Sequence, residues 1–184
     1  RILIDGVDVR QFSLPDLRRH IATVLQDVFL FSGSVAHNIH LGNPEITQER
    51  ISEVARYINA EKFIERLPKG YEEEVGERGS SLSVGERQLL SFARALVYDP
   101  KILVLDEATS SVDTETEHLI RDALATLMAG RTTIAIAHRL STIQDMDQIL
   151  VLHKGVLREA GTHQELLAAR GLYFRLFELQ FRQT

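Results

Sequence analysis

The sequence predicts an α/β protein in which a mixed β-sheet core carries an inserted α-helical subdomain. Residues 102–137 show the pattern strand, helix, strand, which implies a crossover between two parallel strands. Residues 102–105 are all apolar, as in a strand that is covered on both faces. The patterns between residues 42 and 98 are helical, so we expect an insertion in the α/β frame.

The domain boundaries follow from this order. We expect residues 1–41 to form part of the core, residues 42–98 the helical subdomain, and residues 99–184 the rest of the core with a C-terminal helix. The chain opens with a strand, a turn at Asp5-Gly6 and a second strand. Because it begins inside a folded element, we expect further sequence upstream of Arg1.

The elements of the first half are predicted from caps and breakers. Ser13 is placed to cap a short helix, and residues 21–25 then read as a short strand. Residues 42–45, Gly-Asn-Pro-Glu, predict a break between regular elements. Helical patterns follow over residues 48–58, 60–67 and 83–98.

The second half alternates helices and strands. Gly130 ends a helix, and residues 132–137 form an apolar strand that we expect to be buried. Residues 149–160 read as two strands joined by a turn, and an amphipathic tail helix closes the chain. Thr followed three residues later by Glu, the spacing of a capping box, occurs at Thr114–Glu117 and Thr162–Glu165.

The composition excludes several classes of protein. The formal net charge is -5, which argues against a nucleic-acid partner because such a partner needs a basic face. There is no cysteine, so the chain has neither disulfides nor a thiolate zinc site. No apolar run approaches the ~18 residues of a membrane span.

Two carboxylates, Asp106 and Glu107, follow the apolar run at residues 102–105. They lie at the carboxyl end of a predicted parallel strand, where open sheets bind their ligands. Because two adjacent acids are electrostatically costly without a cation, we expect a metal-bound ligand. The alternative is a strand that simply runs into a polar loop.

A second motif is Leu-Ser-Val-Gly-Glu-Arg-Gln at residues 82–88. Ser83 and Glu86 have the spacing of a capping box, and Gly85 allows a ligand to approach the backbone closely. The free amides and the dipole of the helix favour an anion at this end. The alternative is an ordinary, well-capped helix.

Together these segments resemble the nucleotide-binding domains of ABC transporters over essentially the whole chain. Residues 82–88 look like the family signature, and residues 102–107 look like the Walker B strand with its catalytic glutamate. Residues 110–113 are similar to the D-loop, His138 to the switch histidine, and Gln26 to the Q-loop glutamine. The resemblance implies a P-loop NTPase-like (RecA-like) core.

The resemblance also implies ATP hydrolysis and roles for the site residues. Glu107 would polarise the attacking water as general base, and His138 would contact the γ-phosphate. Asp106 and Gln26 would hold Mg²⁺, directly or through water. Asp113 would link two ATP sites across a dimer.

The signature would bind ATP held by a second nucleotide-binding domain, which makes that domain the implied partner. The residues that would contact the γ-phosphate from this side are Ser83, Val84, Gly85 and Glu86. Where the family usually has L-S-G-G-Q, Val84 replaces a glycine and Glu86 replaces the glutamine. One hypothesis is a heterodimer with two unequal ATP sites, and a homodimer stays open.

Residues 74–79, just before the signature, resemble the X-loop of exporters, which importer domains usually lack. Residues 29–38 and 173–180 are also exporter-like. The resemblance implies export driven by ATP, with a transmembrane domain as partner and a place on the cytoplasmic face of a membrane (the inner membrane in a bacterium). We expect Phe29, Phe31 and residues 74–79 to receive the membrane helices.

No G-x-x-x-x-G-K-[ST] stretch occurs in the sequence. We therefore expect the Walker A loop upstream of Arg1, the membrane helices further upstream or on another chain, and no activity in this fragment alone. A soluble ABC ATPase, an importer ATPase and a non-catalytic binding module are the alternatives.

His37 and His40 have a metal-ligand spacing in a helix, but with no third ligand we interpret them as a surface pair.

Overall fold

The computed structural model describes residues 1–76, 79, 81–106, 114–137 and 140–181. The chain consists of two compact units, Arg1–Ile134 and Ala135–Thr184. Each unit has its own buried core, and each is taken by itself below.

The first unit opens with the predicted hairpin. Strands β1 (Leu3–Ile4) and β2 (Val7–Asp8) pair antiparallel, and Asp5 (φ 48°) and Gly6 (φ 81°) form the turn. Both turn residues have positive φ, the geometry that tight hairpin turns require. The 3₁₀-helix η1 (Val9–Gln11) follows.

Helix α1 (Leu14–His20) begins where the sequence predicts it. The Ser13 side chain accepts a hydrogen bond from the backbone N–H of Asp16, 3.2 Å away. This bond satisfies one of the amide donors that every helix leaves free at its first turn.

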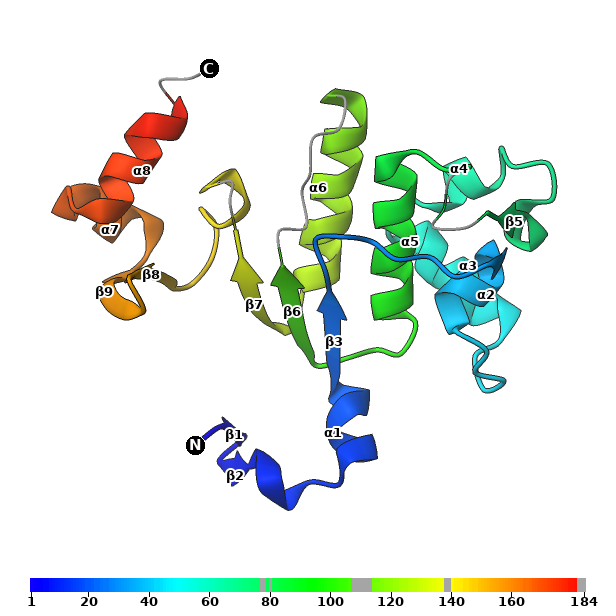
Figure 1. Ribbon diagram of the computed structural model, residues 1–184, viewed down its shortest axis with the longest axis horizontal. Helices are drawn as coiled ribbons and strands as arrows, with labels where there is room; N and C mark the ends of the chain where they lie inside the picture. The colour runs from blue at the N-terminus through cyan, green and yellow to red at the C-terminus, as the bar shows by residue number, and fades with distance from the viewer. Residues whose placement is uncertain (77–78, 80, 107–113, 138–139, 182–184) are drawn as a thin grey trace. The chain divides into compact units, whose positions relative to one another are not determined.

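A parallel sheet lies mainly in the first unit, and its last strand ends two residues beyond Ile134. It consists of β3 (Ile21–Val24), β6 (Ile102–Asp106) and β7 (Thr132–Ile136), in the order β3-β6-β7. Strands β3 and β6 are parallel, from Ile21 beside Ile102 to Val24 beside Leu105. Helix α6 (Thr114–Met128) connects β6 to β7, and the arrows of all three strands point the same way in Figure 1. The predicted crossover is confirmed.

The sheet is less buried than the sequence predicts. Leu103 and Leu105 of β6 are fully buried, but Ile102 and Val104 on the other face are only half-buried. In β7, Ile134 is 57% exposed and Ile136 is 55% exposed. The expectation of a buried strand at residues 132–137 is therefore wrong, because within the described residues only one face of the sheet is well covered.

In the sequence between β3 and β6 lie several short elements, which pack against one another. They are β4 (Gly33–Ser34), α2 (Val35–His40), α3 (Gln48–Tyr57), α4 (Glu61–Ile64), η2 (Gly70–Glu72), β5 (Glu74–Val75) and α5 (Val84–Leu96). The side chains of Ile39, Ile51 and Leu90 form part of the core that these helices share. Helix α2, which precedes residue 42 and contacts α5, is not predicted from the sequence. The domain boundaries at residues 42 and 99 stay a prediction.

The ends of α6 follow the sequence where they are described. Gly130 has φ 70°, the left-handed conformation that commonly ends a helix, and α6 stops at Met128. The helix begins at Thr114, and the side chains of the predicted Thr114–Glu117 capping box lie outside the described residues, so this box stays a prediction.

The second unit is a hairpin with two helices. Its elements are η4 (Leu140–Thr142), β8 (Ile149–His153), β9 (Val156–Gly161), α7 (His163–Ala169) and α8 (Leu172–Phe181). Strands β8 and β9 pair antiparallel, and Ile149, Val151, Leu166 and Tyr173 form the core. The capping box of α7 is confirmed by bonds of 3.3 Å (Glu165 N–H to Thr162 Oγ1) and 2.8 Å (Thr162 N–H to Glu165 Oε2).

The predicted single tail helix is in fact two helices, α7 and α8. Arg170 has φ 51° and ends α7, and the Glu159 carboxylate accepts hydrogen bonds from the amides of Leu172 and Tyr173. A carboxylate that caps a helix start from a distant strand cannot be read from local sequence.

Among the helices described in either unit, none combines the length and the hydropathy of a membrane span.

Candidate functional site

The candidate site begins at the carboxyl edge of the sheet. Because Val24 and Leu105 are register partners, the residues that follow them, Leu25-Gln26 and Asp106, leave the sheet at the same edge. Asp106 is half-buried and Gln26 is exposed. The pairing of β3 with β6 therefore brings together two predicted site residues that are far apart in the sequence.

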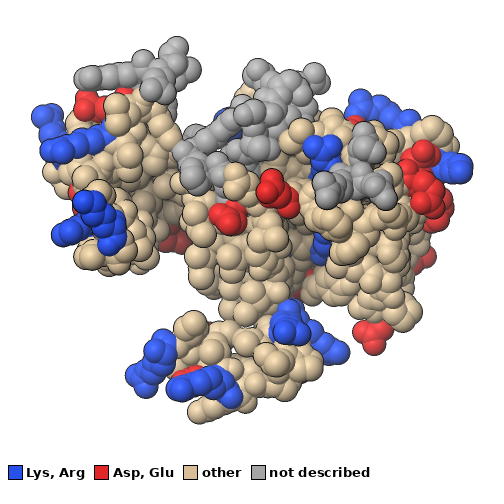
Figure 2. Space-filling view, viewed as in Figure 1, with Lys and Arg blue, Asp and Glu red and all other residues tan. Residues whose placement is uncertain are grey.

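This edge is acidic. Figure 2 shows acidic side chains over the ends toward which β3 and β6 point. A concentration of negative charge would repel a phosphate unless a cation lies between them. Among the described residues, no three His, Cys, Asp or Glu side chains gather as a complete metal cage. Asp106 and Gln26 nevertheless offer carboxylate and amide oxygens, which suit Mg²⁺ that is also bound by water and phosphate.

Three predicted site residues lie outside the described residues: Glu107, Asp113 and His138. In the sequence Glu107 directly follows the last residue of β6, and His138 comes two residues after the end of β7. Their roles stay predictions.

The signature motif forms the start of α5. The capping box is confirmed, because the Glu86 N–H donates to Ser83 Oγ (3.2 Å) and the Ser83 N–H donates to Glu86 Oε2 (2.8 Å). Gly85 is buried, whereas Val84 is 41% exposed. The N–H groups of Val84 and Gly85 have no acceptor within the described part of the chain, so this helix start retains donors for an anion.

The charge of Glu86 has a partner. Besides its bond to the Ser83 N–H, the Glu86 carboxylate lies 3.8 Å from the Arg66 guanidinium. Arg66 is well exposed, so the attraction is weak. In the sequence, Glu86 is an acid in a motif that is expected to bind phosphate. In the structure, its carboxylate points back to the start of its own helix and accepts from the Ser83 N–H.

The turn before the signature is tightly packed. Arg87 donates to the carbonyl of Leu82 at 2.7 Å and to that of Gly79 at 3.4 Å. Gly79 has φ 72°, and a Cβ atom there would lie 2.7 Å from Arg87 and 2.8 Å from Leu30. A side chain at this position would therefore displace either the arginine or the neighbouring segment.

The predicted membrane-domain groove is brought together by a short sheet. Strand β4 pairs with β5, so that Gly33 lies opposite Val75 and Ser34 opposite Glu74. Just before β4, Phe29 is 54% exposed and Phe31 is 45% exposed. The two rings meet edge to face with centroids 5.0 Å apart. The two exporter-like segments are thus neighbours, and they present an exposed aromatic pair.

The sequence does not point to three polar residues around these segments: Asn38, Arg66 and Arg94. Asn38 is fully buried, and Arg94 donates to its backbone carbonyl at 2.8 Å. The one available signal is that Arg94 interrupts an otherwise apolar stretch of α5. Asn is usually exposed, so the sequence does not indicate that Asn38 is buried.

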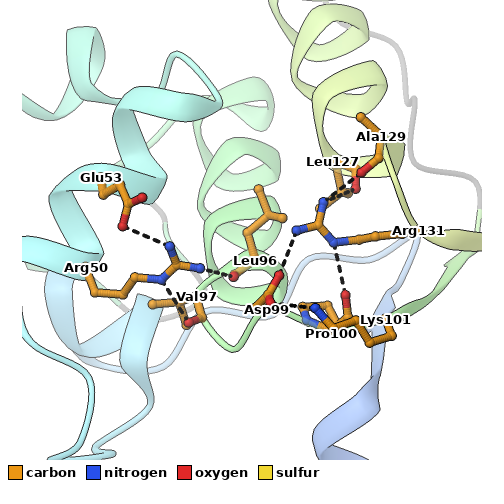
Figure 3. A network of polar contacts seen from close by, with 10 residues as sticks. All are labelled: Arg50, Glu53, Leu96, Val97, Asp99, Pro100, Lys101, Leu127, Ala129 and Arg131. Carbon is orange, nitrogen blue, oxygen red and sulfur yellow. Dashed lines mark hydrogen bonds and ion pairs between the residues drawn. The ribbon is translucent and has the colours of Figure 1, made fainter.

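A cavity of about 950 Å³ lies at the other end of the sheet. Its lining includes Ile21 at the start of β3 and Pro100 just before β6, far from the carboxyl edge. Two of its arginines are held by carbonyls, as Figure 3 shows: Arg50 by Leu96 and Val97, and Arg131 by Pro100, Leu127 and Ala129. Arg94 also lines this cavity, but none of the described residues predicted to contact ATP or Mg²⁺ does.

Comparison with known proteins agrees with this geometry. The ABC transporter family model matches residues 1–110. An ATP-dependent lipid A-core flippase of Syntrophus aciditrophicus is 52% identical over 183 residues, covering 100% of this chain and 30% of the flippase. A fatty acid ABC transporter ATP-binding/permease protein of Mycobacterium bovis is 51% identical over 176 residues, covering 96% of this chain and 28% of the relative.

A solved structure, that of a bacterial Atm1-family ABC exporter with ATP bound, matches with a TM-score of 0.87 and 44% identity. It covers 97% of this chain and 31% of its own length, so this chain spans a little under a third of the relatives it matches. The predicted P-loop NTPase-like fold is confirmed by this match. With a family model over more than half of its residues and such relatives along nearly all of them, the chain belongs to the ABC transporter family.

Proposed function

We propose that this chain is the ATP-binding and ATP-hydrolysing domain of an ABC exporter, which drives transport across a membrane through ATP-dependent dimerisation. One observation carries the proposal: Asp106 and Gln26 share the carboxyl edge of the sheet, while the start of α5 keeps the Val84 and Gly85 amides free for an anion. The names of the relatives, a flippase and an ATP-binding/permease protein, support the exporter part.

The hydrolytic step follows from the residues at the edge. Water would attack the γ-phosphorus in line with the bond to the β-phosphate, and that bond would break. Glu107 would accept the proton of the attacking water as general base. His138 would donate a hydrogen bond to a γ-phosphate oxygen and help to hold the water and Glu107 in place.

Asp106 and Gln26 would hold Mg²⁺ at the same edge. The bound ion would neutralise part of the phosphate charge. The half-buried position of Asp106 suits this task, because a carboxylate that is partly shielded from water attracts a cation more strongly than a fully exposed one.

The second ATP contact would come from the other protomer. The Ser83 hydroxyl and the amides of Val84 and Gly85 would bind the γ-phosphate of ATP held by the partner domain. Glu86 would stay tied to the Ser83 N–H and leave those amides available. Asp113 would link the two sites, and loss of the γ-phosphate would release the closed dimer.

The membrane domain would dock on the surface formed by Phe29, Phe31 and residues 74–79. The exposed aromatic pair and the pairing of β4 with β5 support this assignment. The domain would then lie on the cytoplasmic face of the membrane. Because residues 1–184 contain no G-x-x-x-x-G-K-[ST] loop, we expect this stretch alone to bind ATP weakly and to be inactive.

The altered signature bears on the partner domain. Val84 and Glu86 depart from the usual L-S-G-G-Q, which motivates the hypothesis of a heterodimer with unequal ATP sites. Sequencing the partner tests this hypothesis. A partner with an intact Walker B glutamate and an intact signature would remove its motive.

The main test of the proposed function is Glu107→Gln in the full-length protein. Without a general base we expect ATP turnover to fall by about 10²- to 10⁴-fold, with ATP binding and the closed dimer preserved. Turnover is measured by phosphate release, and binding by equilibrium titration with ATP and Mg²⁺.

Glu165→Gln is the matched control, because Gln also closes a capping box and Glu165 lies in the box of α7. It should leave turnover unchanged. Near-normal turnover in the Glu107→Gln protein would remove Glu107 from the role of base.

A further inference from the structure

Two arginines of α5 hold the two segments of the proposed membrane-domain docking surface. Arg87 donates hydrogen bonds to the carbonyls of Gly79 and Leu82. Arg94 donates hydrogen bonds to the carbonyls of Phe29 and Asn38. Seven residues separate the arginines, which is about two helical turns, so they lie on the same side of the helix. The signature helix thus carries a contact to each segment.

All three nitrogen atoms of the Arg94 guanidinium group donate hydrogen bonds. Nε donates to the Asn38 carbonyl (2.8 Å), Nη1 to the Phe29 carbonyl (2.9 Å), and Nη2 to Asn38 Oδ1 (3.2 Å). The guanidinium carbon also lies 5.7 Å from the centre of the Phe31 ring. One side chain of α5 therefore contacts both members of the exposed aromatic pair.

Asn38 completes the contact from α2. Its Oδ1 accepts from the Phe31 N–H (2.8 Å), and its Nδ2 donates to the carbonyls of Phe31 (2.9 Å) and Ser34 (3.2 Å). Both backbone groups of Phe31 are thus bonded to one fully buried side chain. Tyr98, just after α5, adds a 2.6 Å bond from its hydroxyl to the carbonyl of His40 at the end of α2.

This arrangement is costly for a purely structural contact. Arg94 pairs with no carboxylate within the described part of the chain, so its partly buried charge is met only by neutral oxygens and a ring face. Burial also lowers the pKa of Arg94. An arginine in such surroundings is favoured where a planar set of several donors must fix a backbone.

We propose that Arg94, together with Asn38, is a positioning residue that ties the Phe29–Phe31 pair to the signature helix, so that the pair moves with the helix. The inference rests on the proposed function and adds the residues that couple the ATP contact to the docking surface. Ser83 precedes Arg94 by eleven residues, about 16 Å along a rigid helix. A shift of the signature toward ATP would therefore shift Phe29 and Phe31.

The test is Arg94→Lys in the full-length protein in phospholipid nanodiscs, followed by amide hydrogen exchange with and without AMP-PNP and Mg²⁺. Lysine keeps the charge but cannot reproduce the fork. We expect exchange of residues 29–34 to become about tenfold faster, because their bonds to the α5–α2 contact are lost. The affinity for AMP-PNP should stay within about twofold, since Arg94 is not at the site, and the nucleotide-dependent change in the cytoplasmic loops of the membrane domain should disappear.

Arg50→Lys is the matched control. Arg50 also donates to two carbonyls, Leu96 and Val97 at the end of α5, but it has no bond to residues 29–38. It should behave as the unsubstituted protein in all three measurements. If Arg94→Lys does not fold, Asn38→Leu decides, because leucine has a similar size but lacks both the Oδ1 acceptor of the Phe31 N–H and the Nδ2 donors, and it should free residues 29–34 in the same way.

The outcomes separate the inference from the proposed function. A folded Arg94→Lys or Asn38→Leu protein whose membrane domain still responds to AMP-PNP overturns the inference, as does unchanged exchange at residues 29–34. If the unsubstituted protein binds AMP-PNP without any response in the membrane domain, the proposed function fails instead.

Discussion

At the scale of single residues, Glu86 has an environment that differs from the one its sequence position indicates. In the sequence it is an acid in a motif expected to bind phosphate. In the structure its carboxylate accepts from the Ser83 N–H and lies near Arg66. The capping bond is local and well aligned, whereas the ion pair is exposed, so the bond should contribute most of the stabilisation.

This ranking predicts the effect of two substitutions on stability. Glu86→Ala should lower the free energy of unfolding by about 1 kcal/mol, because the capping box is lost. Arg66→Ala should change it by less than about 0.5 kcal/mol, because an exposed ion pair contributes little. Urea unfolding followed by circular dichroism measures both. An equal loss in the two proteins would mean that the ion pair, and not the cap, holds Glu86.

At the scale of elements, the connection from α5 to β6 is held by side chains rather than by local sequence preference. Asp99 has φ 47° and lies between Lys101 (2.8 Å) and Arg131 (3.1 Å), as Figure 3 shows. The hydrogen bond from Lys101, with a smaller contribution from Arg131, lowers the pKa of Asp99. Its stabilisation is therefore present above the ordinary value of 3.8 and is lost as the pH falls through the lower folded pKa.

The two partners of Asp99 should differ in their effect on stability. The Arg131 side chain is 13% exposed and also donates to three backbone carbonyls, so Arg131→Ala should cost about 2 kcal/mol. Lys101 is 65% exposed, and Lys101→Ala should cost less than about 0.5 kcal/mol. Thermal and urea unfolding at pH 7 measure the difference. A mild effect of Arg131→Ala would show that water replaces the guanidinium at these carbonyls.

At the level of the whole chain, each of the two units has a core of its own. Leu90 is fully buried in the unit Arg1–Ile134, and Tyr173 is 1% exposed in the unit Ala135–Thr184. The Tyr173 hydroxyl also lies 2.7 Å from Nδ1 of His163. Because each unit has its own core, we expect the other unit to stay folded when one core is disrupted.

A pair of core deletions tests this independence. Leu90→Ala and Tyr173→Ala should each cost about 3–5 kcal/mol, the range for truncating a large buried side chain. Hydrogen exchange should accelerate in α5 for the first substitution and in α7 and α8 for the second. Each protein is the control of the other. Accelerated exchange in both units after either substitution would mean that the two cores unfold together.

Features that depend on neighbouring residues can be predicted from the amino-acid order alone. The turn at Asp5-Gly6, the caps at Ser13, Ser83 and Thr162, and the end of α6 near Gly130 all follow from side chains within a few positions of each other. The order of motifs also led to the ABC family, because those motifs recur at a set spacing. Glu107, Asp113 and His138 are predicted in the same way and stay predictions.

Contacts between groups that are distant in the sequence could not be predicted and became known from the folded chain. The contact of Arg94 with Asn38 spans 56 positions and the pairing of Ser34 with Glu74 spans 40, and neither leaves a local pattern. The exposure of Ile134 and Ile136 likewise depends on what covers the sheet, which an apolar strand cannot reveal. The physical reason is that caps and turns are short-range hydrogen bonds, whereas burial and long-range polar contacts depend on how the whole chain is packed.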